Sequence, residues 1–180
     1  MVNIRIFLIA ALTFLMPPEL LAAEFQIGAG ITQNYIDSDT GNEQVDGNTE
    51  NGISEAVSLV VRKRYKGKYL LGAGIDLSNI NGDRYLGIRA IDYQYILLEN
   101  TRVGAFIGAA SINNSLPQNG YYLGFHLTQT NIFNFFDFGA ELRYGSGLAR
   151  DRLLGTDPPG DKPDMFMDIT SLGAVLSKRF

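Results

Sequence analysis

The sequence contains no cysteine, no tryptophan and a single histidine among its 180 residues. Without cysteine the chain has no disulfide scaffold, no thiolate zinc site and no thiol nucleophile, and it cannot carry the lipid anchor of a bacterial lipoprotein. One histidine excludes a metal site built from several imidazole ligands. We therefore expect neither a metal nor a cofactor.

Long apolar runs are also absent from most of the chain. Nowhere in residues 24–180 do 18 consecutive apolar residues occur, so no transmembrane helix is expected. The net charge of -4 argues against a nucleic-acid partner. The hydrophobic content of 46% is too high for a disordered chain, and the length suits one domain.

Residues 1–23 have the pattern of a secretory signal peptide. Arg5 provides a positive start, an apolar run follows over residues 6–16, and small residues precede Glu24. The apolar run spans about half of a bilayer core, which is too short for a transmembrane helix. We expect export and cleavage near Ala23, with an uncleaved interfacial anchor as the alternative, and a single domain over residues 24–180.

Beyond residue 24, apolar side chains recur at every second position, which is the period of a β-strand. In one stretch Tyr69, Leu71, Ala73 and Ile75 alternate with glycine and polar residues. Seven stretches show this alternation clearly. An eighth, over residues 84–98, changes parity, which a bulge near residues 90–91 would explain. The sequence therefore predicts eight strands.

The predicted connections alternate in length. Those after odd strands occupy residues 37–52, 79–82, 113–119 and 146–163, and those after even strands occupy residues 65–67, 99–100 and 129–132. All long connections would then lie on one side, opposite the two termini.

Alternation alone fits either a soluble sandwich with its apolar face inward or a membrane barrel with its apolar face outward. The predicted strands of about 11–16 residues exceed the usual globular strand and reach the length that crosses a bilayer. Glycines and charges share the polar face, which suits the crowded lumen of an eight-stranded barrel. Aromatic residues recur near the strand ends, and the chain ends on Phe180. These features favour the barrel, with a soluble periplasmic β-sandwich as the alternative.

The signal peptide, eight amphipathic strands, tight turns on the terminal side and final aromatic residue together resemble the small outer-membrane β-barrels of Gram-negative bacteria. That superfamily includes outer-membrane protein X, the membrane part of outer-membrane protein A and the opacity proteins. The resemblance implies an all-β, antiparallel, up-and-down transmembrane barrel with short periplasmic turns and longer outer loops. It also implies an outer-membrane location after export.

The C-terminal stretch resembles the signal that such barrels present to their insertion machinery. The residues of this assembly signal are Leu172, Ala174, Leu176 and Phe180. The stretch departs from the family pattern at Lys178, where an apolar residue is usual, and we expect this lysine to reach toward the periplasmic interface.

The inward face of the predicted barrel carries both signs of charge, so neutralising pairs can form and plug the lumen. The expected polar network consists of Arg62, Asp76, Arg102, His126, Asp137, Glu141, Arg143 and Arg179. A two-residue turn at residues 130–131 would place His126 diagonal to Asp137. The resulting candidate catalytic group is His126, Thr128 and Asp137, and the alternative, which we favour, is a hydrogen-bonded plug.

Two charged segments allow two interpretations each. The outer acidic loop contains Asp37, Asp39, Glu43, Asp46 and Glu50. It lacks the final glutamate of a calcium-binding EF-hand, so a solvated acidic loop is favoured over cation binding. Basic residues crowd positions 62–68 at a tight turn. They fit an interfacial girdle or, less simply, contact with an anionic periplasmic partner.

The sequence thus predicts a non-catalytic outer-membrane barrel with a closed lumen. Its expected partners are outer-membrane lipid, lipopolysaccharide, the barrel-insertion machinery and host or surface ligands, and its role is envelope integrity, adhesion or host interaction. The enzymatic alternative is a lipid A-modifying enzyme resembling the outer-membrane deacylases. In that family a histidine occupies the place where this chain has Tyr144, two residues before Ser146, so the activity is not expected.

Overall fold

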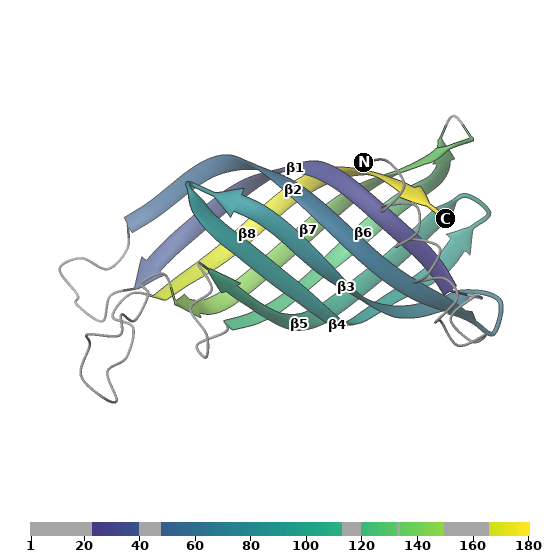
Figure 1. Cartoon of the computed structure of the whole chain (residues 1–180), viewed down its shortest axis with the longest axis horizontal. Helices are drawn as coiled ribbons and strands as arrows, with labels where there is room; N and C mark the ends of the chain where they lie inside the picture. Colours follow the sequence, from purple (N-terminus) through teal and green to yellow (C-terminus); the bar gives the residue numbers. More distant parts are fainter. Residues whose placement is uncertain (1–22, 40–47, 113–119, 133, 150–165) are drawn as a thin grey trace, which may run out of the picture.

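The computed structural model of the chain describes residues 23–39, 48–112, 120–132, 134–149 and 166–180. These residues form a closed barrel in which each strand pairs with its neighbours in sequence order (Figure 1). The strands are β1 (Ala23–Asp39), β2 (Asn48–Tyr65), β3 (Tyr69–Ile80), β4 (Asp83–Leu98), β5 (Thr101–Ile112), β6 (Gly120–Ile132), β7 (Phe136–Ala149) and β8 (Phe166–Arg179). The predicted all-β, eight-stranded antiparallel fold is confirmed.

Strand β1 closes the barrel by pairing with β8, and the backbones of Phe25 and Phe180 exchange hydrogen bonds of 3.3 and 2.9 Å. We followed the paired residues from strand to strand once around the barrel, starting from Tyr65 on β2. The path returns to β2 at Glu55, ten residues from its start. This stagger tilts the strands by about 40° in an eight-stranded barrel. The described residues include no helix that is long and apolar enough to cross a bilayer.

The alternation of side chains is inverted relative to a soluble protein. On β6, Phe125 and Leu127 point outward with exposed fractions of 60% and 52%, whereas Tyr122 and His126 point inward with 0% and 8%. Because successive strand residues face opposite sides, the apolar parity forms the outer wall and the polar parity lines the lumen. A two-sheet sandwich is excluded by the closed register and by this exposure pattern.

Two ends of the barrel can be distinguished (Figure 1). The turn end carries the short connections after β2, β4 and β6, the start of β1 and the end of β8. The loop end carries the connections after β1, β3, β5 and β7. On the loop end, however, β3 and β4 are joined by only Asn81 and Gly82, whose φ angles are 52° and 96°. Positive φ at both positions is the geometry of a type I′ hairpin, for which Asn-Gly is the preferred sequence.

The strands at the loop end are longer than predicted. Residues 37–39 continue β1 and residues 48–52 belong to β2, so the predicted loop over residues 37–52 is too wide. Likewise β7 runs to Ala149, past the predicted loop start at residue 146. The described part of β8 instead begins at Phe166, after the predicted loop end at residue 163. The polar residues there lie in regular strands because their backbones pair across β1, β2 and β8. Residues 40–47, 113–119 and 150–165 lie outside the described residues, as do residues 1–22 of the signal peptide predicted over residues 1–23. Ala23, the last residue of that prediction, is the first residue of β1.

The predicted bulge near residues 90–91 is confirmed, since the β4–β5 register shifts between Arg89 and Ile91. The predicted two-residue turn after β6 is wrong. Strand β6 continues to Ile132, and φ is 58° at Asn131, just before the strand ends, and 62° at Asn134, just after it. Asparagine tolerates this left-handed conformation better than most residues, which permits the longer turn.

Candidate functional site

The lumen is filled by side chains in successive layers. Nearest the loop end lies an apolar layer of side chains that are at most 6% exposed. Its members are Ile36, Ile80, Tyr85, Phe106, Ala110, Ile112, Tyr122, Leu148, Met167 and Ile169. The rings of Phe106 and Tyr122 lie 4.9 Å apart between centroids. This layer differs from the polar lumen predicted from the sequence. Its signal is the inward, even-numbered parity of Ile36 and Ile80.

Arg89 is the centre of the next layer, which is charged. Its guanidinium donates two hydrogen bonds to Asp76, at 2.6 and 2.8 Å, one to Glu141 at 2.8 Å and one to Asp92 at 3.2 Å. The same guanidinium lies 4.0 Å from the centroid of the Phe106 ring. The arginine is 2% exposed. One side chain therefore joins three acids from three strands to the apolar layer.

The bulge in β4 explains why both Arg89 and Asp92 face the lumen. Residues three apart on a regular strand point to opposite sides, and the extra residue in the bulge restores them to one side. The predicted network includes the bulge but not this change of side. Both residues were therefore missing from the predicted network.

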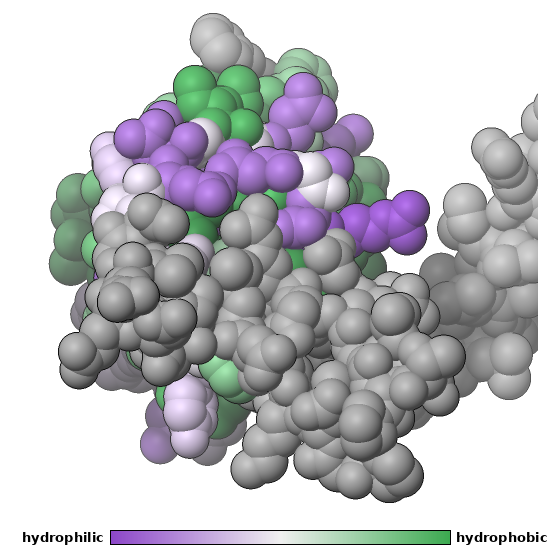
Figure 2. Space-filling model, turned by 90° about the vertical axis from the view of Figure 1, so that its left-hand side faces the viewer, coloured by the Kyte–Doolittle hydropathy of each residue, from purple (hydrophilic) through white to green (hydrophobic). Residues whose placement is uncertain are grey.

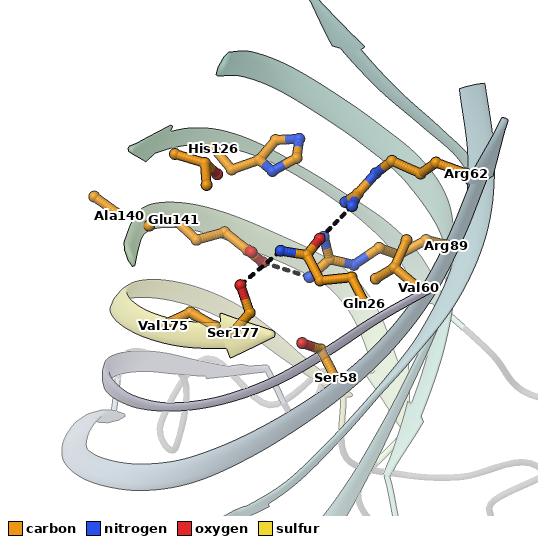
Figure 3. Close-up of a pocket in the computed structure, with 12 residues that line it drawn as sticks. Gln26, Ser58, Val60, Arg62, Arg89, His126, Ala140, Glu141, Val175 and Ser177 are labelled. Atoms are coloured by element: carbon orange, nitrogen blue, oxygen red, sulfur yellow. Dashed lines mark hydrogen bonds and ion pairs between the residues drawn. The ribbon is translucent and has the colours of Figure 1, made fainter. Parts of the chain in front are cut away.

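Two further arginines join the network, Arg62 on its turn-end side (Figure 3) and Arg143 on its loop-end side. Arg62 donates to Asp92 at 3.1 Å and to Gln26, which in turn donates to Ser177 at 2.6 Å. The Nε of Arg143 donates a hydrogen bond to the carboxylate of Glu141. Each inward arginine thus lies beside a carboxylate.

The layer at the turn end joins distant strands. Arg102 of β5 donates to Glu24 of β1 at 2.7 Å, and Arg179 of β8 donates to Asp137 of β7 at 3.0 Å. Glu24 also lies 3.6 Å from Arg179. Over the whole described lumen, five arginines face five carboxylates, and every one of the ten takes part in an ion pair. A balanced interior avoids an uncompensated buried charge, which would be costly.

The candidate dyad of His126 and Asp137 is contradicted by the structure. Because the turn after β6 is longer than predicted, His126 pairs in register with Glu141 instead. Its Nδ1 contacts the amide nitrogen of Gln94 at 3.3 Å, and its Nε2 has no hydrogen-bond partner among the described residues. Asp137 accepts from Arg179 and from the backbone of residue 131. Thr128 lies opposite Gly139, so the three candidate side chains do not form a catalytic group.

A cavity of about 30 Å³ lies beside this network (Figure 3). Its lining includes Gln26, Ser58, Arg62, His126 and Glu141. This volume suits one or two water molecules. It is too small for a lipid or peptide substrate.

The outer wall at the loop end carries a separate polar group. Asp168 accepts hydrogen bonds from the hydroxyls of Tyr144 at 2.7 Å and Ser146 at 2.9 Å, and from the backbone nitrogen of Gly147 at 2.9 Å. This is the stretch that resembles the site of the deacylases. A tyrosine fills the position of the base, and the chain's one histidine lies inside the lumen.

The predicted assembly residues all lie on the outer wall. Leu172, Leu176 and Phe180 are 58%, 49% and 68% exposed, and Ala174 and Lys178 are exposed on the same face. The amine of Lys178 lies 5.1 Å from the centroid of the Phe180 ring.

The predicted acidic loop is only partly described. Asp37 is exposed near the end of β1, and Asp39 is the last residue of that strand. Glu50 accepts a hydrogen bond from Asn81 at 3.3 Å. Glu43 and Asp46 lie outside the described residues. In the part of the chain that the structure describes, no three acidic or histidine side chains are grouped as metal ligands. Figure 2, which faces the loop end, shows hydrophilic side chains gathered there.

Comparisons with known proteins agree with this architecture. No protein-family model and no curated protein sequence matches the chain. Among solved structures, Neisserial surface protein A superposes with a TM-score of 0.54 at 14% identity, covering 87% of this chain and 97% of that one. Ail of Yersinia pestis gives 0.48 at 13% identity, with coverages of 86% and 98%. The outer membrane protein AlkL gives 0.49 at 12% identity, with coverages of 88% and 90%.

At these identities the similarity concerns the fold alone. The closed register of eight antiparallel strands and the superposition on Neisserial surface protein A lead to one conclusion. The chain has the eight-stranded β-barrel fold of the small outer-membrane proteins.

Proposed function

We propose that this protein is a non-catalytic barrel integral to the outer membrane of a Gram-negative bacterium, with a closed lumen. The observation that carries the proposal is the inverted wall. Twenty-eight large apolar or aromatic side chains of the described residues are exposed, while five arginines are paired with carboxylates inside. A soluble monomer rarely exposes so much contiguous apolar surface. Such an apolar wall is stable when it contacts the hydrocarbon chains of a lipid bilayer.

The filled lumen supports an anchoring role over a transport role. The apolar layer and the Arg89 network occupy the cross-section one above the other, and eight strands leave an interior just wide enough for side chains. We propose that the outer loops, whose residues 40–47 and 150–165 lie outside the described part of the chain, meet the outside or the lipopolysaccharide. We propose that they serve envelope integrity, adhesion or host interaction.

The route to the membrane follows from the sequence. We propose export by the signal peptide over residues 1–23 and insertion by the barrel-insertion machinery, which would bind the C-terminal strand. The outward apolar face of Leu172, Leu176 and Phe180 supports this proposal because it resembles the assembly signal of such barrels.

The absence of an outward imidazole supports a non-catalytic role. The only histidine of the chain, His126, is 8% exposed and faces the lumen. It therefore cannot act as a general base on a lipid substrate at the outer wall. The hydroxyls of Tyr144 and Ser146 donate to Asp168, and no imidazole of the described residues lies beside either of them.

Two measurements test the proposal. Cell fractionation should find the mature protein in the outer membrane, with a gel mobility that changes on heating. Recovery in the soluble periplasm would contradict the membrane assignment. In planar bilayers the purified barrel should give no stable conductance steps of the size of general porins. Such steps would show that the lumen is open.

A further inference from the structure

We infer that the turn end of the barrel binds the headgroups of anionic phospholipids. The binding surface is the basic rim, which we define as Lys63, Arg64, Lys66, Lys68 and Lys178. The inference rests on the proposed function, because it needs the barrel to lie in a bilayer with its turn end at the inner leaflet. It explains both the crowded basic turn and the lysine that interrupts the assembly signal.

The basic rim is segregated from the other charges. All five side chains are exposed, and none of them forms an ion pair with another described residue. Among the described residues, Glu99 is the only exposed acid at the turn end. The loop end instead exposes the acids Asp37, Glu50 and Glu55. The arginines of the lumen are neutralised by their partners, so the excess positive charge of this end lies on its surface.

Two members of the rim belong to the outer wall. Lys63 follows Val61 and Lys178 follows Leu176 on the outward parity of β2 and β8, with β1 between them. Lys178 of β8 pairs with Ile27 of β1, and Ile27 pairs on its other side with Leu59 of β2. Because the register shifts by ten residues per circuit of the barrel, the two lysines differ by about 4 Å in position along the barrel axis. The two lysines therefore lie at nearly the same depth, at the edge of the apolar wall that faces the turn end.

Aromatic rings surround the same level. Tyr69 stacks near Tyr93 and Tyr95 with centroid distances of 6.1 and 5.4 Å. The amine of Lys66 lies 5.4 Å from the centroid of the Tyr65 ring. Tyrosines and lysines of this kind gather where a bilayer meets water, with their polar tips at the headgroups.

Position decides between a lipid and a soluble polyanion. A polymer of the periplasm could reach the turn residues 64–68, but the outward lysines at positions 63 and 178 lie on the wall that lipid covers. Headgroup phosphates are the anions present at that place. A cation near an anionic membrane surface strengthens binding by about fivefold. Five cations facing a single acid therefore favour anionic over zwitterionic lipid.

The missing tryptophan of this chain makes a local test possible. Val61→Trp places a single indole beside the basic rim, and Val57→Trp places one four residues nearer the loop end on the same outward face of β2. Each variant is refolded as the full mature chain into vesicles that contain brominated phosphatidylglycerol or brominated phosphatidylcholine in both leaflets. The ratio of quenching by the two lipids measures the local preference.

We expect phosphatidylglycerol to be preferred by about fivefold or more at position 61 and not at position 57. Replacing the five rim cations by glutamine should abolish the preference at position 61, and replacing the four lysines by arginine should preserve it. Raising the salt concentration should weaken it.

An equal preference at both positions, or a preference that survives the glutamine replacements, would overturn the inference. The second result would show that the preference does not come from the rim cations. Failure of either lipid to quench either indole is a different outcome, because it would contradict the membrane location itself.

Discussion

Removing the arginine at the centre of the lumen should destabilise the barrel strongly. Arg89→Met keeps the length of the side chain but removes the guanidinium that bonds Asp76, Asp92 and Glu141. The three buried acids would then share two neighbouring arginines, which leaves one negative charge uncompensated. Breaking a buried pair in this way costs about 3–5 kcal/mol.

The matched control is Arg84→Met on the same strand, where the side chain is exposed at the loop end. Exposed charges contribute about 0–1 kcal/mol, so this variant should unfold almost like the unmodified chain. Urea titration of the barrel in lipid vesicles, followed by circular dichroism and by the mobility of the folded band, gives the free energy of unfolding of each variant.

A charge-balanced double variant tests the physical cause. Adding Glu141→Gln to Arg89→Met restores neutrality, so the double variant should be more stable than the sum of the single losses by about 1–3 kcal/mol. The reasoning would be refuted if Arg89→Met cost no more than Arg84→Met. It would also be refuted if the two losses simply added.

Three further outcomes follow from the structure. Gly104→Ala should cost about 1–3 kcal/mol, because its new methyl group would lie 2.1 Å from the imidazole ring across the strand. Gly139→Ala, also inward but with 3.3 Å to its nearest neighbour, should cost less in the same unfolding titration. Ile75→Arg on the outward face of β3 should cost about 2–4 kcal/mol, and Leu71→Arg, which lies nearer the turn end, should cost less. Deleting Phe180 should lower the amount of protein in the outer membrane while the purified chain still refolds in detergent. Normal surface levels after the deletion would count against an assembly role.

The strands were predictable because one physical rule governs them. A wall between hydrocarbon and a polar lumen forces strict alternation, and β3 and β6 display it from end to end. The turn at Asn81-Gly82 could likewise be placed from its residues. Polar strands beyond the apolar belt carry no such signal, so the sequence predicts loops where β1 and β2 extend at the loop end.

The interior was harder to predict because pairing depends on register. A turn longer than expected moves the partner of His126 from the vicinity of Asp137 to Glu141. The asparagines at positions 131 and 134 were the available signal for that longer turn. Cross-barrel contacts such as Arg102 with Glu24 join strands far apart in sequence, and no local pattern specifies them.

The inside-out wall is tested most directly by two single tryptophans on β6. Phe125 is 60% exposed and Tyr122 is 0% exposed on the same strand. In vesicles of acyl-brominated lipid, the indole of Phe125→Trp should be strongly quenched and that of Tyr122→Trp should not. Stronger quenching at position 122 would show that the barrel faces are reversed, and no quenching at either position would show that the wall does not meet lipid.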